Sequence, residues 1–159
     1  MEAYAERINA EILIKAGVYS HPNSEYKNID TVWDTKVMKY LSASQHTFHK
    51  YLTIINDANV LPTAERPLRG FEGVTGEESS IIGHPRQHFE VVATLPQAKD
   101  KMLFTTGAIT KRNYRKSRVG KKAEFHHILG FLVVEVFDEE HFTARHVKAL
   151  DNGDFQDLI

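Results

Sequence analysis

The chain contains no cysteine among its 159 residues, which excludes disulfides, thiolate zinc sites and cysteine nucleophiles. No run of apolar residues approaches the ~18 needed to cross a bilayer. The opening stretch MEAYAERINAEIL carries acids where a signal peptide would carry bases. Neither charge sign dominates, because the formal net charge is −1, so any contact with nucleic acid must come from a local patch. These absences predict a cytoplasmic protein with no membrane contact.

The composition that remains is that of an ordinary globular protein, with one oddity. Apolar residues make up 42% and charged residues 26% of the chain. The length predicts one domain, which would bury roughly two-thirds of the surface of its unfolded chain. The oddity is histidine, of which there are nine.

The pattern changes once along the chain. We expect a single α+β domain over 1–159, with a helical part at 1–58, a long loop at 59–80 and a β-rich part at 81–150. The middle segment holds two prolines and three glycines in 59-NVLPTAERPLRGFEGVTGEESS-80, which is typical of a loop. We expect it to be a flexible flap over whatever the β-rich part binds.

Periodicity supplies the expected elements. Apolar residues recur at helical spacing over 2–17, and Gly17 is a natural C-terminal stop for this first helix. Asp34 is a suitable N-cap for a short second helix. The stretch 45–55 is ambiguous between helix and strand. A mostly antiparallel C-terminal sheet is expected from strands at 81–82, 89–95, 102–106, 128–137 and 142–147.

Three histidines and two glutamates are candidates for chemistry. His84 and His88 lie in the turn-like segment GHPRQH, and loops at strand ends often carry ligands. Glu124 and His126 would share one face of a strand. Alternatively, the first pair flanks a solvated turn and the second is a hydrogen-bonded strand edge. Glu135, inside a nearly continuous apolar run, needs a partner, for which Arg145 is suitable.

If these histidines converge, they form a metal site. His84, His88 and His126 would be the ligands of a divalent ion such as zinc or manganese. Glu124 would be the general base, and His126 would also be a catalytic residue. That arrangement predicts a metal-dependent hydrolase.

The most polarised stretch is 111-KRNYRKSRVGKK-122, in which seven of twelve residues are basic. We expect it to be an exposed loop between two strands. Lysine and arginine supply phosphate contacts, and tyrosine can stack on a base. Alternatively, the segment is a solvated hairpin whose charge prevents edge-to-edge aggregation. The candidate phosphate- and nucleic-acid-binding residues are Lys111, Arg112, Tyr114, Arg115, Lys116, Arg118, Lys121 and Lys122.

The order of these features resembles the C-terminal half of calcineurin-like metallophosphoesterases over residues 79–147. In that family a Gly-His-x-His turn supplies late metal ligands, and a later strand carries a Gly-Ser turn. Gly83 and His84 match the first turn, whereas Arg86 stands at the second histidine, and Gly107-Ala108 is similar to the Gly-Ser turn. Residues 1–80 contain no Asp-x-His, Gly-Asp-x-x-Asp or Gly-Asn-His-Asp/Glu motif, so the family's two-metal site cannot be assembled from this sequence.

The phrases LPTAERPLRGFEG, TTGAITKRNY and KAEFHH, within 59–157, resemble uncharacterised tailed-bacteriophage proteins. This resemblance implies a viral origin and a location in the host cytoplasm, but it implies no activity.

Three functions follow from these features. The first is a phage-type protein that binds nucleic acid or another phosphate-containing ligand through 111–122, as a remnant or part of a phosphoesterase-like protein. The second is the metal-dependent phosphoesterase or nuclease described above. The third is an interaction protein or inhibitor that engages a host protein through an exposed apolar patch near Phe71, Val74 or the loop 59–80.

Overall fold

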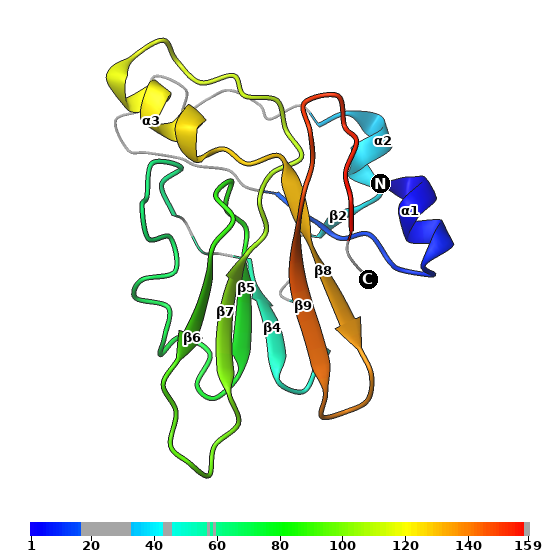
Figure 1. Ribbon diagram of the computed structural model, residues 1–159, viewed down its shortest axis with the longest axis vertical. Coiled ribbons are helices and arrows are strands. Elements are labelled where there is room, and N and C mark those ends of the chain that lie inside the picture. Colours follow the sequence, from blue (N-terminus) through cyan, green and yellow to red (C-terminus); the bar gives the residue numbers. More distant parts are fainter. Residues whose placement is uncertain (17–32, 43–45, 57, 59, 158–159) are drawn as a thin grey trace.

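A five-stranded mixed sheet forms the centre of the molecule in the computed structural model, which describes residues 1–16, 33–42, 46–56, 58 and 60–157. Its strand order is β3-β4-β5-β7-β6, with β4, β5 and β7 parallel and the two outer strands antiparallel to their neighbours (Figure 1). The strands are β3 (His46–His49), β4 (Leu52–Ile55), β5 (Ser79–Ile82), β6 (Phe89–Val92) and β7 (Lys101–Thr105).

The parallel centre corrects the expectation of a mostly antiparallel sheet. The strands themselves were predicted near their observed positions, and the ambiguous 45–55 stretch is the β3–β4 hairpin. Parallel pairing requires a crossover of a dozen or more residues. The segment between β4 and β5 provides one, and its described residues form no helix. The α+β class therefore describes the chain only coarsely: it is a mixed α/β fold of mostly strands with few short helices.

The two faces of this sheet are covered by different parts of the chain. On one face Ile55, Ile82 and Leu103 pack with Leu68 of the β4–β5 crossover. On the other face Leu52, Ile81 and Phe104 pack against the hairpin of β8 (Gly130–Val136) and β9 (Phe142–Lys148). Burying each large apolar side chain stabilises the fold by about 1.5–3 kcal/mol.

The crossover is a packed segment, which corrects the expectation of a flap. Leu68 is fully buried, and Thr53 on β4 donates a hydrogen bond to Glu78 (2.6 Å). The buried Lys101 ammonium donates to the carbonyl oxygens of Glu72 (2.6 Å) and Gly76 (2.5 Å). Because these contacts come from the sheet itself, the crossover is part of the core.

The β8–β9 hairpin is attached to the main sheet through Gln87, which sequence reasoning did not single out. Its amide donates to the Val147 carbonyl oxygen (3.0 Å), and a Cβ on Gly130 would lie 2.3 Å from that same oxygen. Within the hairpin, the expected pairing of Glu135 with Arg145 is confirmed, with 3.0 Å between Oε1 and Nη1.

The first helix and the last described residues meet on this hairpin. Arg145 donates from Nε and Nη2 to both carboxylate oxygens of Asp157 (2.7 Å each), which holds the Asp157 pKa at about 2. Tyr4 donates its hydroxyl to the same carboxylate, and its ring lies edge-on to Phe155. We call this set the terminal clasp.

The N-terminal helices are shorter than expected. Helix α1 (Glu2–Arg7) is followed by Asn9 in a left-handed conformation (φ 53°), where a helix cannot continue. Two residues within the expected helix form β1 (Ile14–Lys15) instead, and this strand pairs with β2 (Leu41–Ser42). Asp34 caps α2 (Thr35–Met38) by accepting from the Lys36 backbone, as predicted. Gly17 lies outside the described residues.

The basic segment is not a loop between two strands, which is the largest correction. Its second half begins α3 (Arg118–His126), so Glu124 and His126 lie on a helix and not on a strand. Helix α3 lies at the carboxyl end of β7 (Figure 1). None of the described helices is long and apolar enough to cross a membrane.

Candidate nucleic-acid interface

Helix α3 begins where Ser117 accepts a hydrogen bond from the Gly120 backbone (3.0 Å), the usual role of serine at an N-cap. The helix buries one side through Gly120, Ala123 and His126. Gly120 has no room for a side chain, because a Cβ there would lie 1.8 Å from the Arg115 carbonyl oxygen. The start of α3 is therefore pressed onto the segment that precedes it.

The opposite side of α3 is cationic. Positions i, i+3, i+4 and i+7 share one face of a helix. On α3 this face carries Arg118, Lys121, Lys122 and Phe125, all of which are exposed. The face therefore consists of three cations followed by an aromatic ring.

The positive charge of this region is only partly neutralised. Lys122 pairs with Glu65 (2.8 Å), and Arg112 lies 3.7 Å from Asp151. Within the described part of the chain, four of the seven cations have no carboxylate within ion-pair distance: Lys111, Lys116, Arg118 and Lys121. We call the exposed surface of residues 111–122 the basic surface.

An open pocket of about 460 Å³ lies beside the basic surface. Arg112, Lys121 and Lys148 supply three cations to its lining, and Glu124 supplies one carboxylate. Phe125, His127 and Ile128 complete it. The pocket thus joins the basic surface to β9 through Lys148. Sequence reasoning missed this lysine, because Lys148 lies far from 111–122 along the chain and in a different element.

His127 fixes the inner wall of this pocket. Its Nε2 donates to the Thr110 carbonyl oxygen (2.8 Å), and its Nδ1 accepts from the Tyr114 hydroxyl (2.8 Å). This assignment requires a neutral ring, and burial lowers the pKa of His127 accordingly. Arg112 adds a hydrogen bond from Nε to the His127 carbonyl oxygen (3.3 Å). Tyr114 and Arg112 therefore hold the basic segment in place.

The structure does not bring the candidate metal ligands into one group. His84 is buried and donates from Nε2 to the Leu61 carbonyl oxygen (3.0 Å), while its Nδ1 accepts from the Arg86 backbone (3.0 Å). His126 accepts from the Arg86 guanidinium (3.2 Å), and His88 lies 4.0 Å from Glu90. In the ranges that the structure describes, no three histidine, aspartate or glutamate side chains are placed to hold a metal ion.

These residues therefore do not fit a metal ion without rearrangement, since both ring nitrogens of His84 are already used. Glu124 is exposed and lines the pocket beside β9. The metal site stays a prediction. If it exists, added zinc or manganese will raise the melting temperature, and His84→Ala with His126→Ala will remove that rise. An unchanged melting temperature in the parent protein would exclude it.

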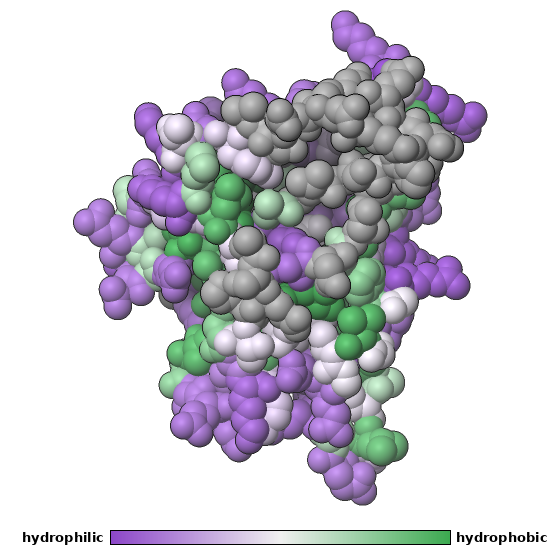
Figure 2. Space-filling model, turned by 180° about the vertical axis from the view of Figure 1, so that it is seen from behind, coloured by the Kyte–Doolittle hydropathy of each residue, from purple (hydrophilic) through white to green (hydrophobic). Residues whose placement is uncertain are grey.

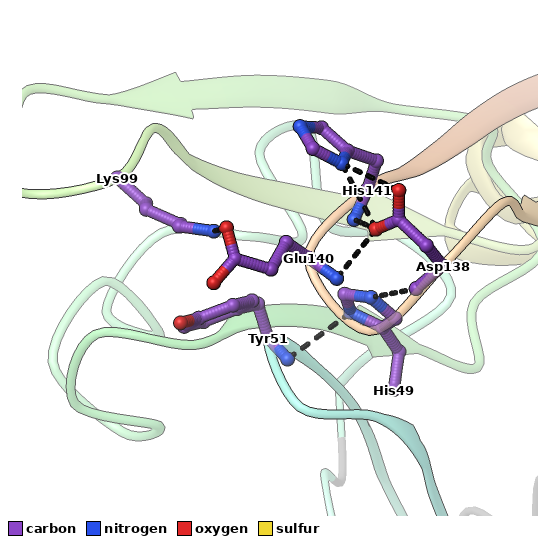
Figure 3. Close-up of polar contacts among 6 residues, drawn as sticks. All are labelled: His49, Tyr51, Lys99, Asp138, Glu140 and His141. Atoms are coloured by element: carbon purple, nitrogen blue, oxygen red, sulfur yellow. Dashed lines mark hydrogen bonds and ion pairs between the residues drawn. The ribbon is translucent and has the colours of Figure 1, made fainter.

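A second polar cluster lies at the turn of the β8–β9 hairpin (Figure 3). The Asp138 carboxylate accepts from the Glu140 and His141 backbones (2.7 and 2.8 Å) and from His141 Nδ1 (2.9 Å). These bonds lower the Asp138 pKa, that from Glu140 most strongly. His49 donates from Nε2 to the Asp138 carbonyl oxygen (3.0 Å). The cluster caps a turn and attaches it to β3, which is a structural role.

The interaction-protein hypothesis requires a continuous exposed apolar patch. Phe71 packs against the core cluster of the crossover, whereas Val74 is exposed. On the face seen in Figure 2, hydrophobic residues are visible in several places between hydrophilic residues and residues whose placement is uncertain. Engagement of a host protein stays a prediction.

Comparison with known proteins finds that the chain is similar in sequence to a bacteriophage protein. It is 31% identical over 166 residues to protein A1 of Escherichia phage T5, an alignment that covers 99% of this chain and 30% of that protein. The expected relation to a phage protein is confirmed. The chain thus spans less than a third of its relative's length. No family model and no solved structure matches, so the metallophosphoesterase resemblance gains no support.

Proposed function

We propose that this relative of a phage protein binds phosphodiester groups of nucleic acid on its basic surface and the adjoining pocket. The observation that carries the proposal is the concentration of exposed cations on one side of α3 in a chain of nearly zero net charge. A local patch of this kind attracts polyanions without requiring an excess of positive charge elsewhere.

The geometry of the basic surface supports contacts with several phosphates. Its cations lie along a helix face and along the segment before it, and Lys148 extends them onto β9. Four of them lack carboxylate partners among the described residues, so a phosphate would not have to break an ion pair to bind them. We expect weak, largely sequence-independent binding, because such contacts position a nucleic acid without reading its bases.

The salt dependence of binding tests this proposal. Each phosphate contact on duplex DNA contributes about −0.9 to the slope of log affinity against log salt. Replacing Lys116, Arg118 and Lys121 with alanine should therefore flatten the slope by roughly two to three units. Fluorescence anisotropy of a labelled duplex across a salt series measures it. Folding should be intact, because the three side chains are exposed.

A control variant carries the same change in net charge at other places. The three residues are exposed lysines: Lys36 on α2, Lys50 directly after β3, and Lys99 shortly before β7. Their replacement with alanine should leave the slope near that of the parent protein. Equal losses in both triple variants would mean that only net charge matters, and affinity that does not change with salt would refute the proposal.

A further inference from the structure

Phe125 is the most exposed large apolar residue of the described chain, with 82% of its surface accessible. It lies at the end of the cationic face of α3, and it also lines the pocket. Its ring is edge-on to that of His126 (centroids 5.5 Å apart, planes at 72°). Because His126 is buried and accepts a hydrogen bond from Arg86, Phe125 extends from a fixed part of the helix.

The surroundings of Phe125 indicate what could cover it. Three cations, Arg112, Lys121 and Lys148, share the pocket with its ring. A flat apolar ring surrounded by cations suits a ligand that combines a flat base with a phosphate. Nucleotides of a single strand have this combination, since an unpaired base can stack on an aromatic side chain while the backbone meets lysine and arginine.

Tyr114, the aromatic residue that the sequence suggested for stacking, has a different environment. Its ring is edge-on to His127 (5.5 Å, 74°), and its hydroxyl donates to that histidine. It is also only partly exposed. A base on Tyr114 would compete with this packing and with the hydrogen bond of the hydroxyl, whereas the side chain of Phe125 is largely exposed and makes no hydrogen bond.

An apolar protein surface is a poorer fit to Phe125. The other strongly exposed apolar residue of α3 is Val119, which is six positions away and therefore roughly 120° around the helix axis. The two side chains do not form one patch. The cations between them favour a polyanion over an apolar partner.

We propose that Phe125 is a stacking platform for an unpaired base, so that the basic surface prefers single-stranded over duplex nucleic acid. This inference rests on the proposed function and adds the kind of nucleic acid and the residue that selects it. In a duplex the bases are stacked on one another and their faces are not accessible, so the ring contributes to single strands alone.

The test compares one single-stranded DNA oligonucleotide of mixed sequence with its own duplex. Phe125→Ala should weaken single-strand binding about 5- to 150-fold and leave duplex binding near the parent value. Phe125→Tyr keeps an aromatic face and should restore binding, whereas Phe125→Leu keeps apolar volume without a face and should not. Melting temperatures of the three variants should match the parent, because the side chain is exposed.

A spectroscopic measurement is independent of affinity. Trp33 is the sole tryptophan of the chain, so Phe125→Trp in a Trp33→Phe background places one tryptophan on the proposed platform. Saturation with the single strand should quench its fluorescence, and saturation with the duplex should not.

The outcomes separate the two proposals. If Phe125→Ala binds single strands as well as the parent while the Lys116, Arg118 and Lys121 variant has lost affinity, the stacking inference is overturned and the proposed function stands. Equal weakening of single strand and duplex also overturns it, since the ring would then act on the shape of the basic surface. If neither DNA binds the parent protein, both proposals fail.

Discussion

Lowering the pH from about 7.5 to about 5.5 should destabilise the fold strongly, because buried histidines that are neutral in the native state become charged on unfolding. Burial lowers the pKa of four histidines below the 6.5 of an exposed ring. They are His84, His126, His127 and His146.

The direction follows from proton binding. Between the lowered pKa of the folded state and 6.5, the unfolded chain holds more protons than the folded one, so stability decreases as the pH falls through that window. Above 6.5 the rings are neutral in both states, and this contribution does not change. Each histidine contributes a slope of up to about 1.4 kcal/mol per pH unit inside the window. Four such slopes together reach at most about 5–6 kcal/mol per pH unit inside the window, and the whole free energy of unfolding of a typical domain is ~5–15 kcal/mol.

Burial is the main cause of these lowered pKa values. The hydrogen bonds that His146 and His84 donate from Nε2 to the carbonyl oxygens of Thr105 (2.6 Å) and Leu61 (3.0 Å) act in the opposite direction and raise the pKa in part. The Nδ1 of His84 accepts from the Arg86 backbone, and a proton there would face an N–H group that cannot accept it. His126 faces the Arg86 guanidinium, with Lys122 and Glu65 nearby, and the cations lower its pKa further.

Urea unfolding at a series of pH values measures this effect. His84→Gln keeps a donor near the Nε2 position and does not titrate, so it should remove about one histidine's share of the slope. His141→Gln is the control, because His141 lies exposed on the β8–β9 turn. A free energy of unfolding that is flat between pH 7.5 and 5.5, a window of about two units around the ordinary histidine pKa, would contradict the prediction.

Replacing Gly120 with alanine should destabilise the protein by about 1–3 kcal/mol or more, against the usual preference for alanine in a helix. The helix preference would favour alanine by about 1 kcal/mol. The new Cβ, however, would lie 1.8 Å from the Arg115 carbonyl oxygen and 2.9 Å from its carbon. Both are backbone atoms, so the segment before α3 must move for the methyl group to fit.

The displaced segment should also become more accessible. Trypsin should cleave near Arg115, Lys116 and Arg118 faster in the Gly120→Ala variant than in the parent protein. Gly73→Ala is the matched control: no atom lies within 4 Å of its Cβ position, so its stability should change by less than about 0.5 kcal/mol. A Gly120→Ala variant as stable as the parent would show that α3 does not press on Arg115.

The strands of the second half were predictable because short runs rich in β-branched and aromatic residues, bounded by turn or charge clusters, favour strands. The parallel order was not, because its crossover contains prolines and glycines and no helical period to indicate a covered face. Helix α3 was missed because its buried side consists of Gly120, Ala123 and His126. None of these is a large apolar residue, so the sequence shows no apolar helical period there. Ser117 at its N-cap was the one available signal.

The candidate site was predictable in charge and not in shape. The cations of 111–122 are visible in the sequence, but Lys148 comes from another element. Phe125 lies between Glu124 and His126, which were expected to share one face of a strand. The histidines misled in a different way. Their partners are carbonyl oxygens of distant segments, such as Leu61 for His84 and Thr110 for His127, and no residue type in the sequence marks a carbonyl acceptor.

The terminal clasp has a consequence for how the domain connects to other polypeptide. Because Tyr4 and Arg145 both bind Asp157, the first helix and the last described residues lie side by side on the hairpin (Figure 1). Polypeptide joined to either end would leave the domain from one place. Such a domain can be inserted into a loop of a larger protein without separating the two halves of its host.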